Sequence, residues 1–461
     1  MYRTLLITGC ALLCVRRRRH LADSRSGSRP VGDRPWWDAT FLGREEQLFG
    51  AVTVVSIVLL LINVAAQLPE PTQWDFGGYY AYGLAGRAHA NFYEPLTNLP
   101  LPFSDAPSSD FVEEVLNVGF PYPPPTMFLL WPFASLPYTA AFLVWSACNL
   151  LALFLAAHLT NQAVRRDVPH LMPFNPILAL FCLWPPVAVS TYLGQSNAFV
   201  LLALAAAYRF RLLPISGAAL ALGVFVKPWV ALLFLWPLSR RRWKVLVAGT
   251  LTFVLSFFLA VIAFGAEVIR TYFSFGFTKR LPKGVLLDSV NESLLSTAKR
   301  VFDVYIFPGQ NVGLYVFFVL ATLIAASTLF VLLGKKCPSD AASLSLLVAT
   351  ALLLYPHSLE HYSSALIFPT VFLCAGLLGG KTKGWNYFDV AFIFLVTAVC
   401  DYHEGAASFI ANFCVWSAIV AVHLLGESDI RGAHANEVVP RTWSPSNEQS
   451  SAPRRAVGSA L

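Results

Sequence analysis

Apolar runs separated by short segments that carry charges and prolines recur along most of the chain. A helix that crosses the hydrocarbon core of a bilayer, about 30 Å thick, needs about 20 mostly apolar residues. The pattern therefore predicts an all-α polytopic membrane protein with about 12 transmembrane helices, several of them short. The candidate spans are 49–67, 138–159, 175–191, 197–212, 215–226, 228–238, 243–265, 311–333, 341–356, 362–379, 386–401 and 405–425. The shorter apolar segment 126–137 is interpreted as an interfacial or re-entrant helix.

The composition narrows the class of protein further. Of 461 residues, 56% are hydrophobic and only 13% are charged, against a charged fraction of about 25% in soluble proteins. This excludes an ordinary soluble enzyme, a disordered chain and a nucleic-acid-binding protein. The eight cysteines show no metal-binding spacing, and most lie inside apolar runs, where they act as small hydrophobic residues.

The distribution of basic residues predicts the orientation of the spans. Cytoplasmic segments of membrane proteins are enriched in Lys and Arg. If the N-terminus is cytoplasmic, about three quarters of the 33 Lys and Arg residues fall on the cytoplasmic side. We therefore expect a basic cytoplasmic tail over residues 1–45, a membrane domain over 46–426 and a disordered cytoplasmic tail over 427–461, in a multi-pass plasma (inner) membrane protein.

The same rule predicts a hairpin within residues 214–237. Arg209 and Arg211 precede this segment and Arg240 to Arg242 follow it, so both of its ends should be cytoplasmic. Two short helices with a break at Lys227, which is followed by a proline, satisfy this requirement.

Two long loops, residues 68–125 and 266–310, are predicted on the extracytoplasmic side. The first is acidic and the second is basic. Long loops are often functional. Opposite charges facing each other across a cleft would suit a proton acceptor on one side and an anionic group on the other.

Asp75 is the candidate general base in the first loop. It lies in the sequence QWDFGGYYAYG, where Tyr79, Tyr80 and their aromatic neighbours could contact the face of a sugar. A carboxylate in this position could deprotonate a hydroxyl nucleophile. The alternative is a solvated loop aspartate beside a belt of interfacial aromatic residues.

Further polar groups occur where the predicted spans end on the extracytoplasmic side. Amide and carboxylate side chains there can hydrogen bond sugar hydroxyls, and cationic groups can bind an anion. The alternatives are helix caps, a lysine that extends to the interface, and a metal site formed by the histidine pair, for which no third ligand is evident. These residues are Gln195 and Asn197 in LGQSN, Lys227, Asn291 and Glu292 in SVNESL, and His357 and His361 in YPHSLEHY.

The ordered set of motifs resembles glycosyltransferase family 87, the DUF2029 group of GT-C membrane glycosyltransferases. The set consists of WDFGGYY, YPPP, GQSN, Lys-Pro in a short hairpin, NESL and PHS followed by a second histidine. The resemblance covers roughly residues 45–425. The family includes mycobacterial α-mannosyltransferases and some arabinofuranosyltransferases.

The resemblance implies an inverting enzyme of the extracytoplasmic face. It would transfer mannose or a similar sugar from a polyprenyl-phosphate donor to a lipid or glycan acceptor. Separately, we expect neither a metal nor a cofactor. Asp75 would be the general base, Lys227, His357 and His361 would bind the donor phosphate, and the remaining polar groups would contact sugar or acceptor. Glu292 stands where the family often has glutamine, and Leu359 and Glu360 depart from its histidine motif.

A secondary transporter is the alternative reading. About 12 spans with broken helices suit that class, but the two halves of the chain show no convincing internal repeat. A non-catalytic subunit of an envelope complex is a further alternative, and it would tolerate loss of Asp75.

Overall fold

The computed structural model describes residues 36–66, 74–96, 120–167, 174–276, 286–287, 291–334, 338–378 and 406–425. Within these ranges the regular structure is helical, and one isolated β-bridge pairs Asn291 with Leu359. The predicted all-α class is confirmed. The expected span 386–401 and the tails 1–35 and 427–461 lie outside the described residues.

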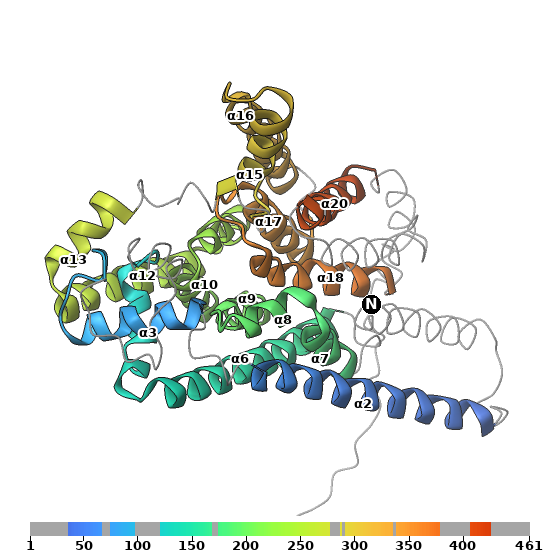
Figure 1. Cartoon of the computed structure of the whole chain (residues 1–461). Coiled ribbons are helices and arrows are strands. Elements are labelled where there is room, and N and C mark those ends of the chain that lie inside the picture. The colour runs from blue at the N-terminus through green and yellow to red at the C-terminus, as the bar shows by residue number, and fades with distance from the viewer. Residues whose placement is uncertain are drawn as a thin grey trace, which may run out of the picture.

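In Figure 1, α2 and α6 run along the lower side of the molecule and α16 projects at the top. The N-terminal half contains α2 (Trp36–Ala65), α3 (Trp74–Arg87), η3 (Pro124–Thr126), α5 (Met127–Leu130), η4 (Phe133–Ser135), α6 (Tyr138–Asp167), α7 (Phe174–Leu183), α8 (Pro185–Tyr192), α9 (Asn197–Arg209) and α10 (Pro214–Val226). The C-terminal half contains η5 (Pro228–Phe234), α11 (Leu235–Ser239), α12 (Trp243–Phe264), α13 (Ala266–Thr271), η6 (Tyr272–Gly276), α15 (Leu294–Ala298), η7 (Lys299–Ile306), α16 (Val312–Leu333), α17 (Asp340–Leu354), η8 (Glu360–Leu366), α18 (Ile367–Leu378) and α20 (Ala406–Leu425).

Three of the described helices are long and apolar enough to cross a membrane, so a count of about 12 spans is not confirmed. They are Tyr138–Arg166, Trp243–Phe264 and Val312–Leu333. The 22 residues of α12 extend about 33 Å, whereas the 13 residues of α9 and of α10 extend only about 20 Å. The helices around the centre of the molecule are therefore shorter than those at its edge.

Several expected elements differ in length or continuity from the apolar runs that predicted them. The run 175–191 forms two helices, because Pro185 begins a new helix and cannot continue α7. The segment 126–137 forms the short turns of η3, α5 and η4. Helix α2 begins at Trp36, ahead of the expected domain boundary at residue 46. The hydropathy of the sequence alone therefore predicts neither where a helix is interrupted nor how far it extends beyond its apolar run.

The predicted hairpin is confirmed. Helix α10 ends at Val226, Lys227 has an extended backbone, and η5 and α11 return along the molecule. The two ends of the hairpin meet, because Arg211 and Arg242 both form ion pairs with Asp340, at 3.0 and 2.7 Å. A single straight helix could not bring these two arginines to one carboxylate.

Two glycines allow α10 and α12 to pack closely. A Cβ atom added to Gly217 would lie 1.9 Å from the carbonyl oxygen of Val245, and one added to Gly249 would lie 2.4 Å from the ring of Phe234. Small residues let helix backbones approach in this way. This close approach fixes the hairpin formed by α10 and η5 against α12.

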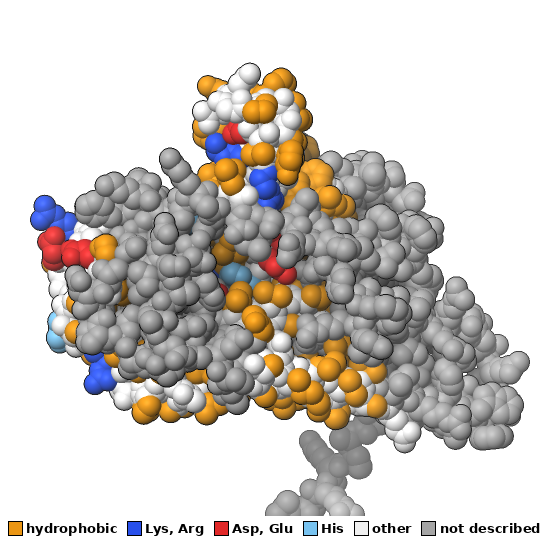
Figure 2. Space-filling model, in the orientation of Figure 1, with side chains coloured by type: hydrophobic (Ala, Val, Ile, Leu, Met, Phe, Trp, Pro, Cys, Tyr) orange, Lys and Arg blue, Asp and Glu red, His pale blue; other side chains and the backbone are white. Residues whose placement is uncertain are grey.

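The described residues form two apolar clusters. The larger lies among α7 to α10, α17 and α18, and the smaller packs α3 against α5, the start of α6 and the end of α12. Exposed apolar side chains cover α16 and the side formed by α2 and α6 (Figure 2). Such a surface suits contact with lipid.

Candidate functional site

Lys227 is the centre of the candidate site. The break between α10 and η5 holds its side chain inside the protein, where its exposed fraction is 0%. The ammonium nitrogen Nζ donates to the hydroxyl of Tyr122 at 3.2 Å and to Oε1 of Gln195 at 3.0 Å. It also lies 4.1 Å from the ring centroid of Tyr362. A buried ammonium group requires such partners.

Gln195 connects this lysine to α3. Its Oε1 also accepts a hydrogen bond from the hydroxyl of Tyr79 at 2.8 Å, so its amide nitrogen is the group that can donate to the carboxylate of Asp75. The turn before it depends on Gly194, which has a φ of +65° and whose carbonyl accepts a hydrogen bond from Trp145 at 2.7 Å. The sequence LGQSN thus places an amide between a cation and an anion.

Asp75 lies in the first turn of α3 and is half-buried. Burial raises the pKa of its carboxyl group, and the hydrogen bond from Gln195 and the charge of Lys227 oppose this rise. Burial lowers the pKa of Lys227 to about 7, although the negative charge of Asp75 acts in the opposite direction. The two groups therefore titrate closer to neutrality than free side chains, and each influences the other.

The two histidines lie on the neighbouring segment between α17 and α18. Burial lowers the pKa of His357 to about 4, and burial together with the charge of Lys227 holds the pKa of His361 well below its usual range. Both rings are therefore neutral near pH 7. Asn197 fixes this segment, because its amide donates to the backbone carbonyl of His361 at 2.9 Å.

Asn291 and Glu292 are held against the same segment from the other side. The amide of Asn291 donates to the carbonyl of Pro356 at 3.0 Å, and Glu292 accepts a hydrogen bond from the hydroxyl of Ser363 at 2.7 Å. The exposed fraction of Glu292 is only 2%. Asn291 and Glu292 therefore contact the segment that carries His357 and His361 through a backbone carbonyl and a serine hydroxyl, and these contacts hold that segment in place.

The structure thus brings most predicted site residues into one region and directs one elsewhere. Asp75, Tyr79, Gln195 and Lys227 form a continuous polar cluster with Tyr122. The hydroxyl of Tyr80 instead donates to the carbonyl of Leu136 at 2.7 Å, on the other side of α3.

Sequence reasoning missed two tyrosines of the cluster. Tyr122 accepts from Lys227, and its hydroxyl is 3.0 Å from that of Tyr79. Tyr362 covers the ammonium group of Lys227 with its ring. Both occur in motifs that were noted for the family resemblance or for other residues, YPPP and YPHSLEHY. A buried ammonium group is stabilised by hydroxyl and aromatic partners. The tyrosines within these two motifs were therefore the signal that could have identified Tyr122 and Tyr362.

No group of three His, Cys, Asp or Glu side chains that could hold a metal ion occurs in the part of the chain that the structure describes. The arrangement offers a partly accessible carboxylate, a dehydrated cation and neutral imidazoles instead. These groups can accept a proton and stabilise an anion.

Comparison with known protein families identifies a match. The model of glycosyltransferase family 87 matches residues 120–356, more than half of the chain. This range includes Tyr122, Gln195 and Lys227 but ends before the two histidines, and it begins after Asp75. Searches of curated proteins and of solved structures gave no match.

Proposed function

Since the chain belongs to glycosyltransferase family 87, we propose that it transfers mannose or a similar sugar from a polyprenyl-phosphate donor to a lipid or glycan acceptor. The family membership supports a membrane glycosyltransferase. The donor class, the inverting outcome and an extracytoplasmic active site are parts of the proposal. The buried Lys227, linked through Gln195 to the carboxylate of Asp75, is the observation that carries it.

In the proposed reaction, Asp75 accepts a proton from the acceptor hydroxyl. The hydroxyl oxygen forms a bond to the anomeric carbon on the face opposite the phosphate, and the bond from that carbon to the phosphate oxygen breaks. The electron pair leaves with the polyprenyl phosphate. A raised pKa makes Asp75 a stronger base than an ordinary aspartate, which favours this role near neutral pH.

Lys227 stabilises the departing phosphate. Negative charge grows on the phosphate oxygens as the bond breaks, so a cation in a dehydrated site binds the transition state more tightly than the ground state. Neutral His357 and His361 can each donate one N–H to phosphate oxygens. Tyr79, Asn197, Asn291 and Glu292 hold the frame in which the sugar would lie.

Sidedness follows from charge in this proposal. The end of the bundle that holds Asp340 is rich in arginine, including Arg209, Arg211 and Arg240 to Arg242, which favours a cytoplasmic position for it. The Lys227 end of α10 then faces the extracytoplasmic side.

The test is incubation of the purified full chain with a panel of polyprenyl-phosphate sugars and a lipid acceptor extract. We expect consumption of one donor with stoichiometric release of polyprenyl phosphate. Turnover of nucleotide sugars alone would contradict the donor class. Uptake of a labelled solute into vesicles without chemical conversion would favour a transporter.

A further inference from the structure

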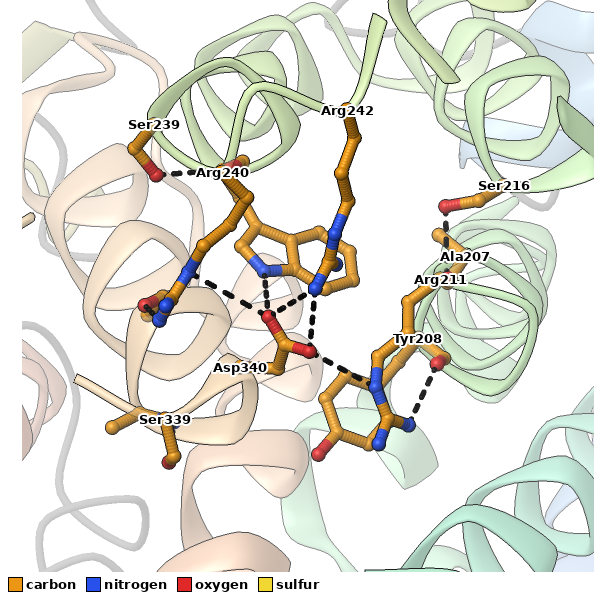
Figure 3. A network of polar contacts seen from close by, with 12 residues as sticks. Ala207, Tyr208, Arg211, Ser216, Ser239, Arg240, Arg242, Ser339 and Asp340 are labelled. Atoms are coloured by element: carbon orange, nitrogen blue, oxygen red, sulfur yellow. Dashed lines mark hydrogen bonds and ion pairs between the residues drawn. The ribbon is translucent and has the colours of Figure 1, made fainter. Parts of the chain in front are cut away.

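A second polar cluster lies at the opposite end of the same helices (Figure 3). There Asp340, the first residue of α17, is surrounded by guanidinium groups. Arg242 donates to both carboxylate oxygens, at 2.8 and 2.7 Å, and Arg211 pairs with Oδ2 at 3.0 Å. Arg240 lies 3.7 Å from Oδ1. We call these three arginines and Asp340 the arginine cluster.

The arginine cluster holds more positive charge than its carboxylate can neutralise. Arg240 and Arg242 alone bring two positive charges to Asp340, which carries one negative charge, and Arg211 joins the same carboxylate. Removing like charges from water without an anion between them is costly. The excess charge therefore favours binding of a further anion.

The arginine cluster also contains donors without acceptors. Nη1 of Arg242 and Nε of Arg240 form no hydrogen bond within the described residues. The distance of 3.7 Å from Nε of Arg240 to Asp340 is that of an ion pair rather than a hydrogen bond. Unsatisfied N–H donors on buried guanidinium groups lower stability. Planar guanidinium groups match phosphate oxygens in geometry as well as charge.

The arginine cluster lies beside a helix that can span a membrane. Trp243 directly follows Arg242, begins α12 and has an exposed fraction of 62%. Tryptophan is enriched where helices meet the headgroup region of a bilayer. Arg240 and Arg242 retain 20% and 15% exposure of their side chains, so a phosphate group could reach them after a change of side-chain rotamer.

We propose that the arginine cluster binds a phosphate group at the end of the bundle opposite Asp75. The phosphate belongs either to the headgroup of an anionic phospholipid or to free inorganic phosphate. In both cases it satisfies the unpaired donors of Arg240 and Arg242 and offsets the excess charge around Asp340. The bound anion ties the turns before α10, α12 and α17 together.

The test measures phospholipid binding to the full chain in nanodiscs of neutral phosphatidylcholine. Phosphatidylglycerol is titrated in, and retained lipid is counted by native mass spectrometry. Arg240→Gln should weaken retention of one phosphatidylglycerol about tenfold, because it removes a charge-assisted hydrogen bond. Arg241→Gln is the matched control, since it removes the same charge from the same turn at an exposed position. Equal retention in all three proteins, or equal losses in both variants, would rule out a phospholipid headgroup at the arginine cluster. The proposal is overturned if inorganic phosphate also fails to distinguish Arg240→Gln from the wild-type protein.

Two further arms identify the source of the phosphate and test the role of charge with a second variant. The first arm adds inorganic phosphate to neutral nanodiscs. If phosphate raises the melting temperature of the wild-type protein but not that of Arg240→Gln, and phosphatidylglycerol is retained equally by both proteins, free phosphate is the ligand. Asp340→Asn removes the competing carboxylate, so it should retain phosphatidylglycerol more tightly than the wild-type protein. Weaker retention by this variant would contradict the proposal even if Arg240→Gln could not be purified.

Discussion

The two ends of the central helices carry the same kinds of charge in opposite arrangements. At one end, Lys227 reaches Asp75 only through Gln195, and no ion pair joins Asp75 to another described residue. At the other end, Asp340 is bound directly by arginines. Charges in direct contact hold elements together, whereas charges kept apart in a dehydrated site remain available for chemistry. The first end is therefore suited to catalysis and the second to assembly.

Replacing the two aspartates by asparagine should separate these roles most strongly. Asp75→Asn removes the proposed base and should lower turnover at least about a hundredfold, with normal expression and thermal stability. Asp340→Asn leaves the arginines without their anion and should lower the free energy of unfolding by about 3 kcal/mol, with unchanged turnover per folded molecule. Glycosyl transfer and thermal unfolding measured on both variants would check this. Near-normal turnover of Asp75→Asn would show that the assignment of the base is wrong.

Removing the buried cation should have the next largest effect. Lys227→Met should lower kcat about a hundredfold, because loss of one preorganised electrostatic group typically costs this much. Lys244→Met is the control, since Lys244 is exposed at the other end of the molecule. Steady-state kinetics with varied donor would contradict the assignment if both variants kept the wild-type kcat and the same dependence on donor concentration.

The helix crossing that supports both ends can be tested by one added methyl group. Gly217→Ala would place Cβ against the carbonyl oxygen of Val245. We expect a loss of about 1–3 kcal/mol in stability, as for other overpacked positions. Gly50→Ala, where no atom lies within 4 Å of the added Cβ, is the control. Equal melting temperatures for both variants would show that the helices separate without cost.

The pH dependence of turnover should be the mildest effect. The proposed reaction needs Asp75 ionised and Lys227 protonated, so the rate should rise as Asp75 loses its proton and fall as Lys227 loses its own, near pH 7. Lys227→Arg should keep its charge and move the alkaline decline to higher pH. A decline at the same pH in this variant would assign it to another group.

Sequence patterns predicted what depends on local composition. The apolar runs gave the helical class, and the arginines on both sides of residues 214–237 gave the hairpin. Gln195 and Lys227 were singled out because they lie where predicted spans end on one side of the membrane, and polar or ionisable groups near spans are functional candidates.

What depends on tertiary contact could not be predicted. Tyr122 and Tyr362 become partners of Lys227 only once segments far apart in sequence meet. Tyr79 and Tyr80 are neighbours in sequence, yet α3 directs them to different faces and different partners. The neutral state of His357 depends on burial, which composition does not report.

The short central helices have a consequence for the depth of the candidate site. Helix α10 extends about 20 Å, about 10 Å less than a typical hydrocarbon core, and most of its residues are buried. If α10 begins at one surface of the membrane, its other end stops about 10 Å short of the opposite surface. In that case Lys227 lies recessed within the protein, and the headgroup of the proposed lipid donor has to descend by a similar distance to reach it.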